Sequence, residues 1–204
     1  MYTHDKEEKD MLNKISRKMT SGLIKYVKDV RYDEEVYVYG FELVISTVLC
    51  WIAIIINAFL LSDVMSGIVF IIVFSSLRIF AGGYHADSYI KCFLMSNAFF
   101  VFLMMLKGLL SGIHILVWWG VFLMCVGYIG QNAPIINPKQ PIGENKKKLC
   151  KKNIRYVLGI DVLVIFVYTI LNQKMANMAI LSIALVAVLM LISNNHKNTS
   201  RKEV

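Results

Sequence analysis

Residues 41–61 read FELVISTVLCWIAIIINAFLL, and residues 64–80 read VMSGIVFIIVFSSLRIF. Both runs are continuously apolar, and the first matches the roughly 20 residues that a helix needs to cross the hydrocarbon core of a bilayer. Continuous runs exclude a transmembrane barrel, whose strands alternate between lipid-facing and lumen-facing residues. Four more such runs predict an all-α polytopic membrane protein with six transmembrane helices; they cover residues 93–111, 113–130, 156–172 and 175–193.

Composition supports this class. The chain is 57% hydrophobic and 18% charged, with a mean hydropathy of +0.58, a balance too apolar for a soluble domain of 204 residues. The first forty residues are highly charged and contain no apolar core of a cleavable signal peptide, so we expect the first span to serve as the insertion signal. We expect a single membrane domain over residues 1–204.

The predicted organisation begins with an amphipathic segment. Within residues 11–30, apolar side chains recur at steps of three and four while lysines and an arginine fill the gaps, which predicts a helix lying at the inner interface or under the bundle. Anchoring is favoured over substrate recognition as the role of this helix. The predicted segments are 1–40 (interfacial), 41–80 (two spans), 78–92 (polar, at the inner face), 93–130 (two spans), 131–155 (a proline-containing basic loop), 156–193 (two spans) and 194–204 (the tail).

The positive charges predict the orientation. Of the 22 lysines and arginines, all but Lys107 and Lys174 fall in the segments 1–40, 78–92, 131–155 and 194–204. Six spans place these four segments on one side, which the positive-inside rule assigns to the cytoplasm. The net charge of +8 therefore indicates membrane topology and attraction to anionic lipid, and no nucleic-acid-binding module is recognisable. Both termini and the polar segment 78–92 are expected to be cytoplasmic.

The polar segment 78–92 carries the candidate chemistry. It contains His85 and Cys92, a base and a thiol, preceded by Gly82 and Gly83, which can bend the chain. On a straight helix a spacing of seven residues would separate the two by about 10 Å. Proton exchange between a thiol and an imidazole needs roughly 3 to 4 Å. We therefore predict that residues 85–92 do not form one straight helix, with Cys92 as nucleophile and His85 as general base and then general acid.

Supporting roles are less specific. Arg78 could favour the thiolate, clamp a substrate carboxylate or stabilise an oxyanion, or it could simply extend to the interface. Asp87 is the carboxylate nearest to His85 in sequence, but it could point elsewhere. The intramembrane Asp161 and Asn57 are interpreted as helix-to-helix hydrogen-bonding groups.

Two rival interpretations use the same residues. A small transporter could use Arg78, His85 and Asp87 as an ion or substrate site, with Cys92 incidental. A metal site of His85, Asp87 and Cys92 has enough ligands for catalytic zinc but follows no recognised pattern, so neither metal nor cofactor is predicted. The four cysteines at positions 50, 92, 125 and 150 form no paired motif, and disulfides are not expected.

The pattern Arg78-x-x-x-Gly82-Gly83-x-His85-x6-Cys92, after two apolar spans and a basic amphipathic N-terminus, resembles the accessory gene regulator B (AgrB) family. The resemblance extends to the Asn137-Pro138-Lys139 loop and to the lysine-rich stretch after it. It implies a cysteine endopeptidase of the bacterial plasma membrane that processes the membrane-bound pro-peptide of a quorum-sensing signal. The catalytic pair would be Cys92 and His85, with Arg78 and a glycine at 82 or 83 associated with activity.

The resemblance also implies a mechanism and partners. Cys92 would attack near the C-terminal end of the pro-peptide, expel its tail and leave a thioester, which a cysteine or serine of the substrate would open to form a thiolactone or lactone. Tyr84, Tyr89 and Phe93 are expected to help enclose the site. A homodimer is implied, and because the family's substrates have acidic tails, the lysines expected to hold them are Lys146, Lys147, Lys148, Lys151 and Lys152; from the residues alone this cluster is interpreted as topogenic.

Overall fold

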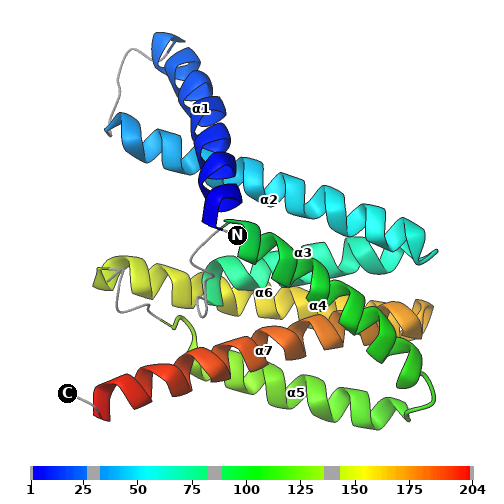
Figure 1. Ribbon diagram of the computed structural model, residues 1–204. Helices are drawn as coiled ribbons and strands as arrows, with labels where there is room; N and C mark the ends of the chain where they lie inside the picture. The colour runs from blue at the N-terminus through cyan, green and yellow to red at the C-terminus, as the bar shows by residue number, and fades with distance from the viewer. Residues whose placement is uncertain (1, 27–32, 82–88, 136–142, 203–204) are drawn as a thin grey trace. The chain divides into compact units, whose positions relative to one another are not determined.

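A computed structural model describes residues 2–26, 33–81, 89–135 and 143–202. These residues form seven α-helices (Figure 1), and Ile135 adds an isolated backbone bridge by donating its N–H to the Ala81 carbonyl at 2.9 Å. The helices are α1 (Tyr2–Tyr26), α2 (Glu34–Leu60), α3 (Val64–Ala81), α4 (Tyr89–Leu109), α5 (Ile115–Asn132), α6 (Glu144–Leu171) and α7 (Gln173–Lys202).

The prediction of six spans in an all-α protein is confirmed, because α2 to α7 are each long and apolar enough to cross a bilayer. The predicted boundaries differ at several helix starts. Residues 144–155, assigned from the sequence to a loop, are the first three turns of α6. The reason is local: no proline follows Pro141, and Glu144 with the lysines after it are good helix formers, the glutamate also complementing the helix dipole.

The described contacts divide the chain into two compact units. One contains α1, most of α2 and the start of α4 (Met1–Ile54 and Ala86–Asn97), and the other contains the remainder (Ile55–His85 and Ala98–Val204). The prediction of a single membrane domain over residues 1–204 stays a prediction.

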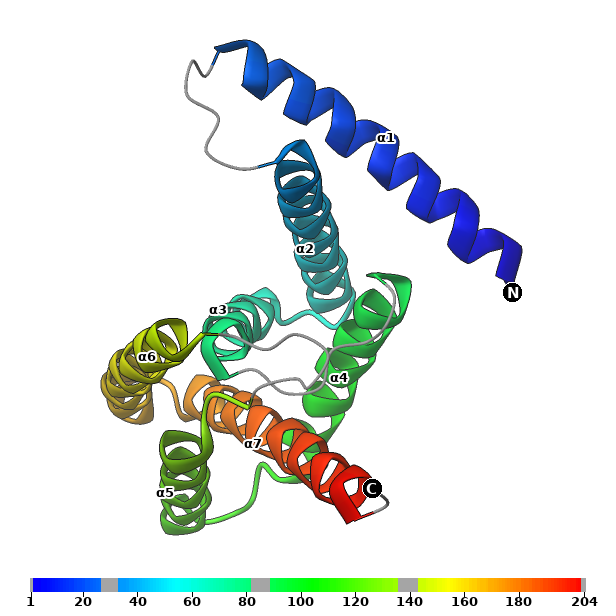
Figure 2. The same ribbon diagram turned by 90° about the vertical axis from the view of Figure 1, so that its left-hand side faces the viewer.

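Helix α7 is the centre of the second unit. It lies against α3, α5 and α6 (Figure 2), and 72% of its membrane window is buried inside the protein, compared with 22% for α6 and 17% for α5. The side chains of the surrounding helices that face away from α7 are largely apolar and exposed, as Leu163 and Leu123 are. Such surfaces are stable when lipid covers them, because lipid tails solvate apolar side chains.

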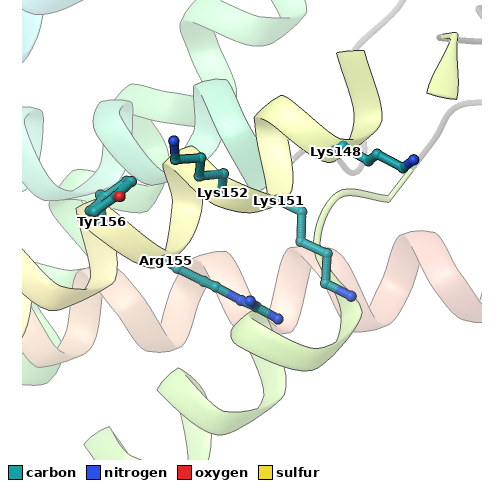
Figure 3. A pocket seen from close by; sticks show the side chains of 5 residues that line it. All are labelled: Lys148, Lys151, Lys152, Arg155 and Tyr156. Atoms are coloured by element: carbon teal, nitrogen blue, oxygen red, sulfur yellow. The ribbon is translucent and has the colours of Figure 1, made fainter. Parts of the chain in front are cut away.

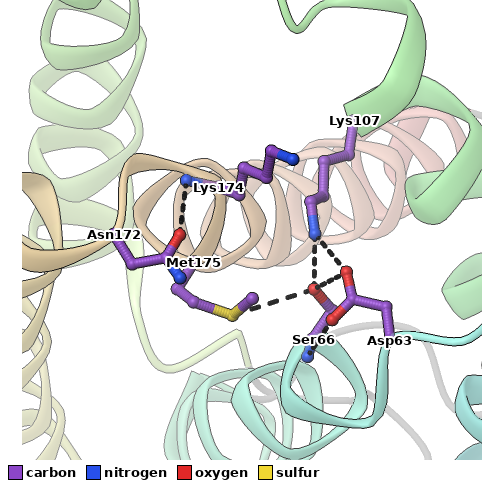
Figure 4. A network of polar contacts seen from close by, with 6 residues as sticks. All are labelled: Asp63, Ser66, Lys107, Asn172, Lys174 and Met175. Carbon is purple, nitrogen blue, oxygen red and sulfur yellow. Dashed lines mark hydrogen bonds and ion pairs between the residues drawn. The ribbon is translucent and has the colours of Figure 1, made fainter.

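The junction between α2 and α3 is built around Asp63. Its Oδ1 accepts the Ser66 N–H at 3.1 Å, which caps the start of α3, and its Oδ2 accepts the Ser66 hydroxyl at 2.8 Å. The ammonium of Lys107, near the end of α4, donates to Asp63 Oδ2 at 2.6 Å and to Ser66 Oγ at 2.5 Å (Figure 4). Lys107 is only 8% exposed, so the carboxylate of Asp63 neutralises a cation that has left water.

One residue joins α6 to α7. Asn172 donates its backbone N–H to the Tyr168 carbonyl at 2.7 Å, closing α6, and its side-chain Oδ1 accepts the Lys174 N–H at 3.1 Å, opening α7 (Figure 4). Asn172 therefore satisfies backbone groups at the end of α6 and at the start of α7.

Asp161 is buried on the stripe of α6 that also buries Ile154, Leu158 and Ile165. The sequence interpretation gives it a hydrogen bond to a neighbouring helix. Within the described part of the chain, however, its Oδ2 has no hydrogen-bond partner, so this interpretation is not supported for that oxygen.

Helix α1 confirms the predicted helix over residues 11–26; residues 27–30 lie outside the described part. Its polar side chains face α2: Asn13 donates to Glu42 Oε1 at 2.7 Å, Arg17 pairs with Glu35 at 2.7 Å, and Ser16 is fully buried. The Glu35 carboxylate holds the pKa of Arg17 above its ordinary value by a hydrogen bond and by charge. The opposite face is apolar and exposed; it consists of Met11, Ile15, Met19 and Leu23.

Because this face points away from the protein surface that α1 contacts, we expect it to enter the lipid interface. Cysteines introduced at Ile15 and at Ser21, both exposed side chains of α1 but on different faces of the helix, provide the comparison. In membrane vesicles, a charged maleimide should label Ile15→Cys several-fold more slowly than Ser21→Cys, and detergent should remove the difference. Equal labelling in intact vesicles would contradict lipid burial of this face.

A second expectation concerns Asp63. Burial by itself would raise the pKa of this carboxyl. Hydrogen bonds from Lys107 and from the Ser66 hydroxyl and N–H, together with the Lys107 charge, nevertheless hold the pKa below its ordinary value of 3.8. A depressed pKa stabilises the fold above about pH 4, and this contribution is lost as the pH falls through the folded-state pKa. Asp63→Asn should therefore destabilise the protein at pH 7 by about 1 to 3 kcal/mol.

Thermal unfolding in detergent measures this effect. The stability difference between wild type and Asp63→Asn should shrink as the pH falls below about 4, and Lys107→Met should be milder because it leaves no buried unpaired ammonium. A difference that stays constant from pH 7 to pH 3 would show that the carboxylate charge is not the stabilising feature.

Candidate functional site

Cys92 lies in the first turn of α4, at one end of a membrane span, and its side chain is half-buried. It is a free thiol, as are Cys50, Cys125 and Cys150. A thiol in this position is neither sealed in the bundle nor fully in water.

The other residues of the polar segment lie outside the described residues: Gly82, Gly83, His85 and Asp87. The convergence of His85 with Cys92 and the bend between them stay predictions. Residues 89–92 are helical. The proposed metal set of His85, Asp87 and Cys92 likewise lies mostly in this part of the chain.

Arg78 lies in the last turn of α3, in the second unit. Its guanidinium carbon is 5.6 Å from the centroid of the Phe74 ring, one turn earlier on the same helix. This cation–π geometry holds the stem of the side chain along the helix. Because Cys92 belongs to the first unit, the role of Arg78 toward the thiol stays a prediction.

The surroundings of Cys92 that the structure does describe come from α2. Tyr89, one turn before Cys92, donates its hydroxyl to Glu42 Oε2 at 3.1 Å. Beyond Cys92, Asn97 lies with its Nδ2 at 3.9 Å from Cys50 Sγ, within hydrogen-bonding range for sulfur. Ser96 also forms a side-chain hydrogen bond with Cys50. The turn that carries Cys92 is therefore held against α2 on both sides.

The sequence interpretation did not single out Glu42. The sequence does contain a signal for Glu42. Placing a carboxylate inside an apolar span costs free energy, and such residues commonly have a function. Glu42 is the only acidic residue in the predicted span 41–61. Tyr89 is predicted from the sequence to help enclose the site, and in the structure its hydroxyl donates a hydrogen bond to Glu42.

The basic residues at the start of α6 form the second candidate region. A hollow of about 400 Å³ is lined by Lys148, Lys151, Lys152, Arg155 and Tyr156 (Figure 3). Lys151 and Arg155, one helical turn apart, project to the same side, whereas the Lys152 ammonium lies 5.8 Å from the Tyr156 ring centroid. Lys147 is exposed nearby, and the side chain of Lys146 lies outside the described part. We call Lys147, Lys148, Lys151, Lys152 and Arg155 the basic surface.

Comparison with known proteins identifies the relatives of this chain. A family model described as Accessory gene regulator B (AgrB) matches residues 15–192. The chain belongs to the AgrB family. An AgrB-like protein of Clostridium perfringens (strain SM101 / Type A) is 27% identical over 183 residues, covering 79% of this chain and 82% of that relative. No solved structure matches the chain.

Family membership gives this membrane protein a role in processing an agr quorum-sensing peptide. The matched range includes the start of α4 with Cys92 and the basic surface of α6. It also includes the C-terminal part of α1 from residue 15, and with it the Arg17–Glu35 ion pair, whereas Asn13 precedes the matched range.

Proposed function

We propose that this AgrB protein is a cysteine endopeptidase and peptide cyclase that removes the C-terminal tail of a membrane-bound autoinducer pro-peptide. The observation that carries the proposal is the half-buried thiol of Cys92 at the end of a span in a family of peptide-processing proteins. Cysteine attacks as the thiolate and needs a nearby base, and His85 is the histidine of the polar segment.

The chemistry proceeds in two balanced steps. Cys92 thiolate attacks the scissile carbonyl carbon, its proton having passed to His85; the C–N bond breaks, and His85 returns the proton to the leaving amine. The product is an acyl-enzyme thioester and a free tail. A thiol or hydroxyl of the substrate then attacks the thioester carbon, forms the ring bond and releases Cys92, with the proton again transferred through His85.

Hydrolysis is the competing reaction, because water can also open the thioester. The second step exchanges one acyl bond for another of similar type when the attacking group is a thiol, so selectivity depends on keeping water away. A cysteine at the end of an apolar span, partly covered by its neighbours, suits this requirement. A thiol wholly in the aqueous phase would favour a linear acid.

The orientation of the protein follows from its charges. The excess of lysine and arginine on the segments 1–40, 78–92, 131–155 and 194–204 supports cytoplasmic termini and a cytoplasmic catalytic segment. The pro-peptide would then be processed at the inner leaflet. We expect a homodimer, as the family resemblance implies.

Replacement of Cys92 by alanine should abolish both tail release and cyclisation while leaving expression and melting temperature near those of the wild type. His85→Ala should have a similar effect on the first step, since the thiol then lacks its base. Mass spectrometry of the co-expressed pro-peptide encoded beside the gene gives the readout, a tail-less and dehydrated product. Replacement of Cys150 by alanine, on the basic entry to α6, is the matched control.

This experiment also separates the rivals. A transporter that uses Arg78, His85 and Asp87 should tolerate Cys92→Ala, whereas a metal-dependent reaction should stop on strong chelation. Cleavage that persists without the Cys92 thiol would refute the peptidase proposal.

The basic surface supports a further expectation, the binding of the acidic tail. Reversing Lys151 and Arg155 to glutamate places negative charge on the side shared by these two residues. The KM for the pro-peptide should rise by roughly 3- to 30-fold, since exposed charge pairs are worth about 0.2 to 1 kcal/mol each, with little change in kcat. Reversal of Lys18 together with Lys25, both on α1, makes the same change in total charge and is the control. An equal effect there would indicate long-range attraction only.

A further inference from the structure

Glu42 carries a buried carboxylate whose two oxygens accept hydrogen bonds from neutral side chains. It is 7% exposed, a degree of burial rare for glutamate unless its oxygens are satisfied. Each oxygen has a different neutral donor: Asn13 Nδ2 bonds Oε1 at 2.7 Å and the Tyr89 hydroxyl bonds Oε2 at 3.1 Å. The carboxylate therefore links three helices, α1, α2 and the first turn of α4.

Two contacts fix the register between α2 and α4. Glu42 meets Tyr89, and Cys50 meets Asn97; in both pairs the residues are 47 positions apart. Because the offset is the same for both pairs, α2 and α4 run parallel and keep the same register between them. The two contacts are eight residues apart on each helix, which is about 12 Å at 1.5 Å per residue. Cys92 lies between these contacts, three residues after Tyr89 and five before Asn97.

The hydrogen bond of Tyr89 holds the first turn of α4, the turn that carries Cys92. The first turn of a helix lacks the full set of backbone hydrogen bonds and frays unless other groups hold it. Side chains three residues apart share a helix face, so a hydrogen bond at Tyr89 fixes the direction in which Cys92 points. Bonds from a donor to an ionised carboxylate are among the stronger hydrogen bonds, which suits this anchoring role.

We propose that Glu42 is a positioning residue for the nucleophile: through Tyr89 it sets the rotation of the first turn of α4 and thereby the aim of Cys92 Sγ. Asn13 holds the other carboxylate oxygen, so the carboxylate has a single orientation. Glu42 touches no reacting atom and acts through Tyr89. This inference rests on the proposed function of Cys92 as nucleophile.

The test combines turnover with the reactivity of the thiol itself. Tyr89→Phe removes only the hydroxyl, and Glu42→Gln removes the charge at constant size. Each should lower kcat for pro-peptide cleavage by roughly 10- to 100-fold, the cost of a misaligned attacking group, and leave KM within about twofold. Tyr168→Phe, on α6, is the matched control and should leave both unchanged.

A second readout needs no substrate. Alkylation of the full-length protein by iodoacetamide, resolved by mass spectrometry of each cysteine peptide, should change in rate at Cys92 in both variants. The rate at Cys150, on α6, should stay at the wild-type value. The double variant should be no slower than the slower single variant, because both changes remove one shared hydrogen bond.

The outcomes distinguish the two proposals. If Cys92→Ala abolishes cleavage but Tyr89→Phe and Glu42→Gln retain wild-type kcat and Cys92 alkylation, the positioning role is overturned and the peptidase proposal stands. Lower melting temperatures with unchanged kcat per folded molecule would also overturn it, since they indicate a purely structural bond. Additive losses in the double variant would show that Glu42 does not act through Tyr89. Cleavage by Cys92→Ala would overturn the proposed function itself.

Discussion

Water is absent from the hydrocarbon core of a bilayer, and this constraint underlies the whole structure. Every backbone N–H and C=O of a spanning segment must find its partner within the chain, which helices achieve residue by residue. The requirement becomes hardest at helix ends, where backbone groups lack partners. Side chains take over there: Asp63 at the start of α3, His114 at the start of α5 and Asn172 between α6 and α7.

The arrangement of helices in the second unit follows from packing rather than from exclusion of water. Lipid tails are as apolar as leucine, so burial of an apolar side chain against another helix is not favoured by the hydrophobic effect alone. Helices therefore associate where their side chains pack more closely with each other than with lipid tails. Helix α7 allows such close packing because small side chains, among them Ala176, Ala179 and Ala187, lie on its largely buried surface. Helices α3, α5 and α6 thereby share one central partner.

Asp63 and Glu42 illustrate two ways in which the protein stabilises the charge of a carboxylate removed from water. Asp63 faces an ammonium, so its charge is cancelled and the pair joins α3 to α4. Glu42 faces an amide and a phenol, so its charge is spread into hydrogen bonds whose directions are fixed. The first arrangement suits a structural tie, whereas the second suits the orientation of a neighbouring helical turn.

The same physics separates what can be read from the sequence from what cannot. Span existence, helix type and the amphipathic character of residues 11–26 depend on local composition and periodicity, and these predictions are confirmed. The prediction of a loop over 131–155 is wrong for residues 144–155, because the prolines at 134, 138 and 141 prevent a helix only near their own positions. Cys92 and His85 could be proposed as a catalytic pair from the sequence pattern, and both their role and their convergence stay predictions.

The sequence by itself determined the class of the protein, the six spans and the residues with reactive side chains, because apolar length and residue chemistry are properties of short segments. Only the tertiary structure decided that α1 contacts α2 by its polar face, that Lys107 finds Asp63, and that Glu42 finds Tyr89. These contacts join residues 29, 44 and 47 positions apart. Which helix faces meet depends on the rotation and register of whole helices, and local periodicity leaves both undetermined.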